Sequence, residues 1–297
     1  MGIELDNAKD IIKNNQTDLA FVIGNGVNRY NNSDTISWKQ MLTEMWRTQN
    51  GDIFNEQNLQ GLSLTELYDL ISLNSSETMT LKDFVVEKTN SIKRSNTHDF
   101  LLKKFQKLDV PVLTLNFDQL LEHGLSKFEL IGKKKFTDYY PWNIYYSSKK
   151  LQSPLDSFAI WHINGMTSYK RSIRLSLSEY MKQVVRTNSY IQEGVSLENC
   201  DQKNTNNWNG FNTWLHVIFN KSLFIFGLAL NQDEVFLRWL LIQREKYFKK
   251  YPDRVKKSWY ICPKNDIITG TKFFLQQLNF QIIELDTYTD IYENMFE

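Results

Sequence analysis

Short, almost entirely apolar runs recur along the chain and alternate with stretches of helical periodicity. Continuous apolar runs of this length are typical of strands covered on both faces, as in parallel sheets. Parallel strands need crossover connections, which helices usually supply. The sequence therefore predicts an α/β fold, with a Rossmann-like parallel sheet and helices on both faces. The runs expected to be strands are 18–23, 110–115, 158–163, 221–230, 258–263 and 280–285.

Two segments interrupt this alternation. Residues 37–95 contain several helical patterns, and the first opens with Ser37 and Gln40 at the spacing of a capping box. We expect a helical insertion or subdomain there. Residues 166–213 form a polar, variable segment. A chain of 297 residues can hold two domains, but no internal repeat or low-complexity tract divides it, so we expect one domain over 1–297.

Charge and cysteine content exclude several classes of protein. The 35 Lys and Arg residues against 34 Asp and Glu give a net charge of +1, which excludes binding to nucleic acid through bulk positive charge. The two cysteines, Cys200 and Cys262, supply neither a disulfide framework nor a zinc ribbon. No paired metal-ligand spacing occurs, so we expect no metal. With no signal peptide and no bilayer-spanning run, we expect a cytoplasmic protein without membrane contact.

Polar and glycine residues follow four of the apolar runs. In an open parallel sheet, ligands bind outside the carboxyl ends of the strands. We therefore expect these four segments to converge on one site. They are Gly24-Asn25-Gly26, Asn116-Phe117-Asp118, His162-Ile163-Asn164-Gly165 and Gly227-Leu228-Ala229-Leu230.

Each segment also has a purely structural interpretation. The glycines around Asn25 suit a loop that holds a phosphate with its backbone amides, but they also suit a tight turn. Asn116 suits the N-cap of a helix predicted over 117–124, with Asp118 as a favourable acid in its first turn. His162 lies in an apolar strand, where a histidine is more often a hydrogen-bonded core residue than a catalyst.

Taken together and in this order, the segments resemble the motifs of the sirtuin superfamily, specifically its NAD-consuming branch in bacterial antiphage defence. The segment Gly24–Asn28 resembles the glycine loop, and Thr114–Asp118 matches the Thr-x-Asn-x-Asp motif. His162, followed by Gly165, resembles the catalytic histidine. The stretch from Gly227 to Asp233 is similar to the later Gly-x-Ser-x-x-x-Asp motif, with alanine where serine is common.

This resemblance covers about residues 18–285 and implies that NAD is the substrate. It implies that Asn116 positions water and the ribose hydroxyls, that His162 takes a proton from one of them, and that Asp118 orients its neighbours. The backbone of 24–28 would hold the pyrophosphate. The NAD-binding residues implied are Gly24, Asn25, Gly26, Val27, Asn28, Gly227 and Asp233.

The sirtuin deacylases carry a four-cysteine zinc module, which this chain lacks. We therefore expect an NAD glycohydrolase that releases nicotinamide and ADP-ribose as the effector of an antiphage system. The alternatives are a protein deacylase or ADP-ribosyltransferase, and a non-catalytic module that binds NAD or ADP-ribose. Because uncontrolled NAD hydrolysis would kill the host, we expect control by homo-oligomerisation or by a separate sensor chain, such as an ATPase or an Argonaute-like protein.

Overall fold

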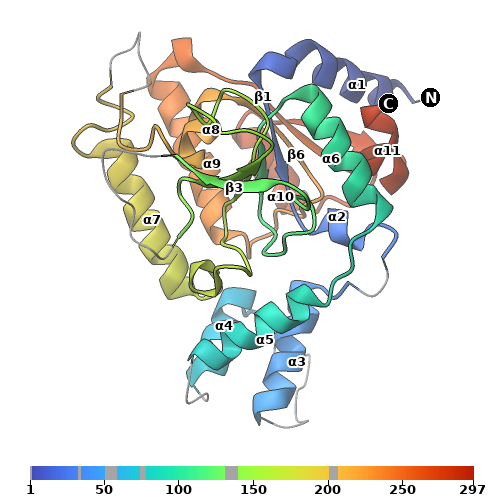
Figure 1. Cartoon of the computed structure of the whole chain (residues 1–297), viewed down its shortest axis with the longest axis vertical. Coiled ribbons are helices and arrows are strands. Elements are labelled where there is room, and N and C mark those ends of the chain that lie inside the picture. Colours follow the sequence, from blue (N-terminus) through green and yellow to red (C-terminus); the bar gives the residue numbers. More distant parts are fainter. Residues whose placement is uncertain (1, 33–34, 51–58, 74–77, 131–139, 201–206) are drawn as a thin grey trace.

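Eight strands form one mixed, mostly parallel sheet at the centre of the molecule (Figure 1). The structure is a computed structural model and describes residues 2–32, 35–50, 59–73, 78–130, 140–200 and 207–297. The strand order is β3-β4-β5-β2-β1-β6-β7-β8. The parallel strands are β1 (Leu19–Ile23), β2 (Val112–Thr114), β5 (Ile160–His162), β6 (Ser222–Phe226), β7 (Ser258–Pro263) and β8 (Gln281–Leu285). The sequence-based prediction of an α/β protein is confirmed at this level.

The sheet ends in an antiparallel edge that the apolar runs do not predict. Strand β3 (Ser126–Glu129) pairs antiparallel with β4 (Ile144–Ser147), and β4 pairs antiparallel with β5. No residue of β3 is fully buried, so its composition lacks the apolar character of the inner strands. It pairs through its backbone, which a pattern of side chains does not reveal.

Alternate residues of the inner strands face two separate apolar cores. From β1, Ala20 and Val22 join the core covered by α8 (Trp214–Asn220), α9 (Val235–Lys250) and α10 (Thr269–Gln277). The intervening Phe21 joins the core covered by α1 (Ile3–Asn15), α6 (Asn96–Leu108) and α11 (Tyr288–Tyr292). Strands buried on both faces account for the continuous apolar runs in the sequence. Figure 1 shows these helices on the two sides of the sheet.

Three helices between β1 and α6 form a lobe that projects from the sheet (Figure 1). They are α3 (Trp38–Asn50), α4 (Leu64–Leu73) and α5 (Thr78–Asn90). The helical lobe has its own apolar core, which includes Met45, Tyr68 and Val85. The predicted capping box is confirmed, because the Ser37 amide donates to Gln40 Oε1 at 2.7 Å and the Gln40 amide donates to Ser37 Oγ at 3.2 Å.

The variable segment 166–213 contains a long helix, α7 (Leu177–Gln192). Ser176 and Glu179 cap its first turn reciprocally. The buried side chains of Tyr180 and Tyr190 join the core on the α9 side of the sheet. Within the segment, 201–206 lie outside the described residues.

The helix predicted over 117–124 is wrong, since this stretch forms turns. The carbonyl groups that would continue a helix are bonded elsewhere. Asn116 O accepts from the His162 ring at 2.8 Å, Phe117 O accepts from the Thr167 amide at 2.8 Å, and Leu120 O accepts from Arg94. Long-range partners therefore override the local helical pattern.

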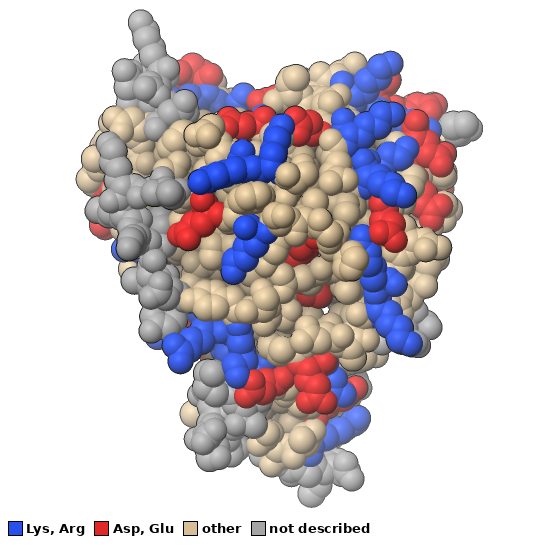
Figure 2. Space-filling view, viewed as in Figure 1, with Lys and Arg blue, Asp and Glu red and all other residues tan. Residues whose placement is uncertain are grey.

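None of the helices in the described ranges combines the length and apolar character required to cross a bilayer. Figure 2 shows Lys and Arg side chains interspersed with Asp and Glu over the face in view, rather than a continuous area of one sign.

Candidate active site

A pocket of about 380 Å³ lies where the sheet meets the helical lobe. Strand β2, which follows β1 in the sheet's chain order, pairs with one side of β1, and β6, the first strand of the other half of the sheet, pairs with its other side. The strand order therefore reverses at β1. Such a crevice at the carboxyl ends of the strands is the expected ligand site of an open α/β sheet. All four segments selected from the sequence contribute to its walls, through Asn25 and Gly26, Asn116 and Asp118, Asn164, and Gly227.

The glycines at the ends of β1 and β6 allow two loops to pack backbone against backbone. The Gly26 amide donates to Gly227 O at 2.8 Å, and a Cβ on Gly24 would lie 2.7 Å from the same oxygen. Gly227 has φ +66°, a left-handed conformation that L side chains rarely adopt. Loop packing therefore explains these glycines without a ligand.

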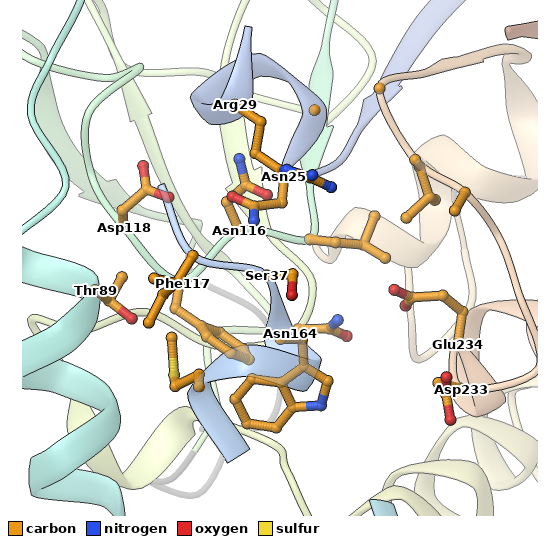
Figure 3. Close-up of a pocket in the computed structure, with 18 of the residues that line it drawn as sticks. Asn25, Arg29, Ser37, Thr89, Asn116, Phe117, Asp118, Asn164, Asp233 and Glu234 are labelled. Carbon is orange, nitrogen blue, oxygen red and sulfur yellow. The ribbon is translucent and has the colours of Figure 1, made fainter. Parts of the chain in front are cut away.

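The backbone of 24–28 does not offer the row of amides that a phosphate loop needs. The amides of residues 26–29 all donate hydrogen bonds within the protein, to Gly227 O, Gly24 O and Asn25 O. Val27 and Asn28 are buried behind the wall, and neither lines the pocket. The expectation that this backbone holds a pyrophosphate is therefore corrected. The side chains of Asn25 and Arg29 are what this loop presents to the pocket (Figure 3).

Asn28 connects the pocket wall to helix α6. Its side-chain amide donates to Asp118 Oδ2 at 2.6 Å and to Asn25 Oδ1 at 2.9 Å, and its oxygen lies 2.9 Å from His98 Nε2. Because the Ser95 amide donates to His98 Nδ1, the ring proton is on Nε2 and points at Asn28. Burial lowers the pKa of His98 to about 4, with a further contribution from Arg94, so the ring is neutral. This chain of hydrogen bonds fixes the orientation of Asn25 and Asp118.

Asp118 borders the pocket, but its carboxylate is held by the protein. Besides the bond from Asn28, Oδ1 accepts from the Leu120 amide at 3.2 Å. Burial raises the pKa of Asp118, against the lowering effect of these hydrogen bonds. In Figure 3 the side chain lies at one side of the cavity. This geometry agrees with an orienting role rather than with attack on a substrate.

His162 does not reach the pocket. It is the last residue of β5, its side chain is fully buried, and both ring nitrogens have partners. Nδ1 lies 2.8 Å from Asn116 O and Nε2 lies 2.7 Å from Glu122 Oε1. Burial by itself lowers the pKa of His162, but the Glu122 carboxylate outweighs it, so the pKa is raised and the ring is an imidazolium paired with a carboxylate. This geometry does not support the expectation that His162 takes a proton from the substrate or a water. Its ring instead holds the Asn116 carbonyl and so positions Asn116.

Asn116 and Asn164 present amide side chains to the pocket, each just beyond a strand end (Figure 3). Asn116 Nδ2 donates to Gly24 O at 3.3 Å, while its backbone carbonyl is held by His162. Among the described residues, the Asn164 side chain has no hydrogen-bond partner. Sequence reasoning named Asn164 only as part of a segment and chose His162 instead. The signal that could have identified Asn164 is its position two residues beyond His162, past the end of β5, where ligands bind.

Asp233 lines the pocket and also fastens the helical lobe to the sheet. Its Oδ1 accepts from the Leu64 amide at the start of α4 at 2.7 Å. A second fastening comes from Lys82 of α5, whose Nζ donates to Ile173 O at 2.9 Å and to Glu179 Oε1 at 2.5 Å. These contacts bring the apolar wall of the lobe against the polar edge of the sheet.

The wall on the lobe side is apolar and partly aromatic. Trp38 and Phe117 meet edge to face, with ring centroids 6.3 Å apart, and Met41 and Leu175 extend this surface. The guanidinium of Arg29, on the sheet side, has no ion pair or hydrogen bond with the described residues. The pocket therefore combines an apolar surface suited to a planar ring with amides and a cation suited to a polar, anionic ligand.

No protein-family model matches the chain, and no curated protein is significantly similar to it. Within the described residues, no group of three or more His, Cys, Asp or Glu side chains is placed to hold a metal ion.

Proposed function

We propose that this protein is an NAD glycohydrolase, which cleaves NAD to nicotinamide and ADP-ribose. The observation that carries the proposal is the pocket at the strand ends, where the Asn and Asp of the Thr-x-Asn-x-Asp motif meet the two glycine loops. This convergence agrees with the resemblance to the sirtuin-like NAD-consuming branch. The reversal of strand order beside β1 fits the Rossmann-like description of the sheet.

The residues on the walls suit each part of this substrate. The aromatic surface of Trp38 and Phe117 suits the planar nicotinamide or adenine ring. The guanidinium of Arg29, which has no ion pair with the described residues, suits the pyrophosphate in place of backbone amides. The amides of Asn116 and Asn164 suit the ribose hydroxyls.

The reaction needs little from the protein beyond such positioning. The ribosyl–nicotinamide bond has a cationic leaving group that departs neutral, so no general acid is required. The transition state resembles an oxocarbenium ion, as in other glycoside hydrolysis. A pocket that holds the ribose and admits one water therefore supplies much of the catalysis.

We further propose that the reaction depletes NAD during antiphage defence, under the control of a homo-oligomer or a separate sensor chain. This part of the proposal rests on the resemblance and on the toxicity of unregulated NAD loss.

The identity of the products tests the function. We expect purified protein, incubated with NAD and an acetyl-lysine peptide, to release nicotinamide and ADP-ribose in equal amounts, as measured by chromatography and mass spectrometry. O-acetyl-ADP-ribose in place of ADP-ribose would identify a deacylase, and ADP-ribose attached to protein would identify a transferase. Saturable NAD binding without release of nicotinamide would leave two candidates, a hydrolase that requires its sensor chain and the binding module.

A further inference from the structure

One carboxylate on the pocket wall is not used by the fold. Glu234 follows Asp233 in the loop between β6 and α9 and occupies the N-cap position of α9. Its side chain makes no capping hydrogen bond there and has no partner among the described residues. Figure 3 shows its carboxylate pointing into the cavity, on the side opposite Asp118 and facing Asn164.

The other carboxylates of the pocket all accept hydrogen bonds from the protein. Asp118 accepts from Asn28, Asp233 accepts from the Leu64 amide, and Asp266 accepts from the Tyr288 hydroxyl at 3.1 Å. In the described part of the chain, Glu234 is thus the lining carboxylate that accepts no hydrogen bond from the protein, so that both of its oxygens are open to a ligand or a water. Since His162 is fully buried and bonded at both ring nitrogens, it does not reach a water in the pocket, whereas the Glu234 carboxylate does.

We propose that Glu234 is the general base that takes a proton from the attacking water. This inference rests on the proposed function and names a catalytic residue for it. The water oxygen forms a bond to C1′ of the ribose as the C1′–N1 bond breaks. The bonding pair leaves with N1 and neutralises the charge of nicotinamide. One water proton passes to the Glu234 carboxylate, and the product is ADP-ribose with a hydroxyl at C1′.

The surroundings of Glu234 support this assignment. Burial raises the pKa of Glu234 to about 7, and the neighbouring Asp233 carboxylate adds to the effect. A base whose pKa lies near the working pH is both available and strong enough to accept a proton. The remaining charged or titratable side chains of the pocket are Arg29, Asp118, Arg174, Tyr180, Asp233, Tyr260, Cys262, Asp266 and Tyr288.

Two of these groups are poor bases or nucleophiles at neutral pH. Burial raises the pKa of the Cys262 thiol to about 12 and that of Tyr180 far above its usual value. The guanidinium of Arg174 contacts the Glu179 carboxylate and the Tyr140 ring, so its positive charge is directed at these groups.

The pH dependence of nicotinamide release in Glu234→Gln tests the proposal. For the wild type, we expect the rate to fall about tenfold per pH unit below pH ~7, because the protonated carboxyl cannot act as a base. At pH 8 we expect Glu234→Gln to lose about 10²-fold in rate and to lose this acidic limb. Glu234→Asp should keep the limb at a reduced rate, and Glu193→Gln, an exposed change at the residue that follows α7, should match the wild type.

Melting temperatures show whether Glu234→Gln folds and whether the pKa of Glu234 is raised in the folded protein. Because the folded-state pKa is raised, ionisation of Glu234 costs stability as pH rises from about 4.5 to about 7. Glu234→Gln cannot ionise, so it should melt higher than the wild type at pH 8 but not at pH 4.

The outcomes separate this inference from the proposed function. If Glu234→Gln releases nicotinamide at the wild-type rate, or loses rate while keeping the acidic limb, Glu234 is not the base but the hydrolase stands. If the wild type neither binds nor cleaves NAD from pH 5 to 9, the proposed function fails, and the role of Glu234 fails with it.

Discussion

Replacing Glu122 with alanine is expected to lower the free energy of unfolding by about 3–5 kcal/mol, because it leaves a buried imidazolium without its counter-ion. The side chains of Glu122 and His162 are 3% and 0% exposed, and their N–O distance is 2.7 Å. Removing either partner of such a pair is far more costly than removing a surface ion pair. Denaturant unfolding of the wild type and of Glu122→Ala measures the difference directly.

The loss of unfolding free energy in Glu122→Ala should depend on pH. The pKa of His162 is raised in the folded state, so the pair stabilises the protein fully below the ordinary histidine pKa near 6.5, and the stabilisation is lost as pH rises through the raised value. The gap between the wild type and Glu122→Ala should therefore narrow toward alkaline pH. Lys88 and Glu44 form a partly exposed pair, so Glu44→Ala is a control that should cost less than about 1 kcal/mol. Equal losses in the two variants would contradict the buried-pair description.

Replacing Asn116 with alanine is expected to reduce nicotinamide release by about 10²–10³-fold with little loss of stability. The variant keeps the backbone carbonyl that His162 holds, and it removes the side-chain amide that faces the pocket together with its long, 3.3 Å hydrogen bond to Gly24 O. Loss of one preorganised polar group from an active site typically has an effect of this size. Steady-state rates, with melting temperatures as the check on folding, measure the effect.

Asn164→Ala should also lose activity, since the Asn164 amide faces the same space and makes no hydrogen bond with the described residues that the variant would lose. Asn7→Ala makes the same change at a half-buried position of α1 that does not line the pocket, and it serves as the control. Wild-type activity in both pocket variants would place the reaction elsewhere.

Much of the fold could be predicted because strands buried on both faces leave a strong local signal. Phe21 and Val22 of β1 are apolar since each faces a different core. The edge strand β3 left no such signal because its side chains are largely exposed. The helix predicted at Asn116 failed for another reason, since partners such as His162 and Thr167 lie far along the chain.

The site was predicted at the level of segments but not of individual side chains. The strand-end rule located the four converging segments, and it does not say which side chain faces the pocket. His162 ends β5 and is buried, whereas Asn164 lies beyond the strand and lines the cavity. Glu122 and Asn28 act through contacts 40 and 90 residues away in sequence, which no local spacing encodes. Glu234 follows a residue named from the motif, and only the geometry shows that it has no hydrogen-bond partner among the residues the structure describes.

The central claim is that NAD is bound and cleaved in this pocket. We would test it most directly by measuring NAD binding and nicotinamide release together, for the wild type and Asn116→Ala. We expect the wild type to release nicotinamide with ADP-ribose as the co-product. We expect Asn116→Ala still to bind NAD but to release nicotinamide at least about 10²-fold more slowly. Absence of both NAD binding and turnover in the wild type would contradict it.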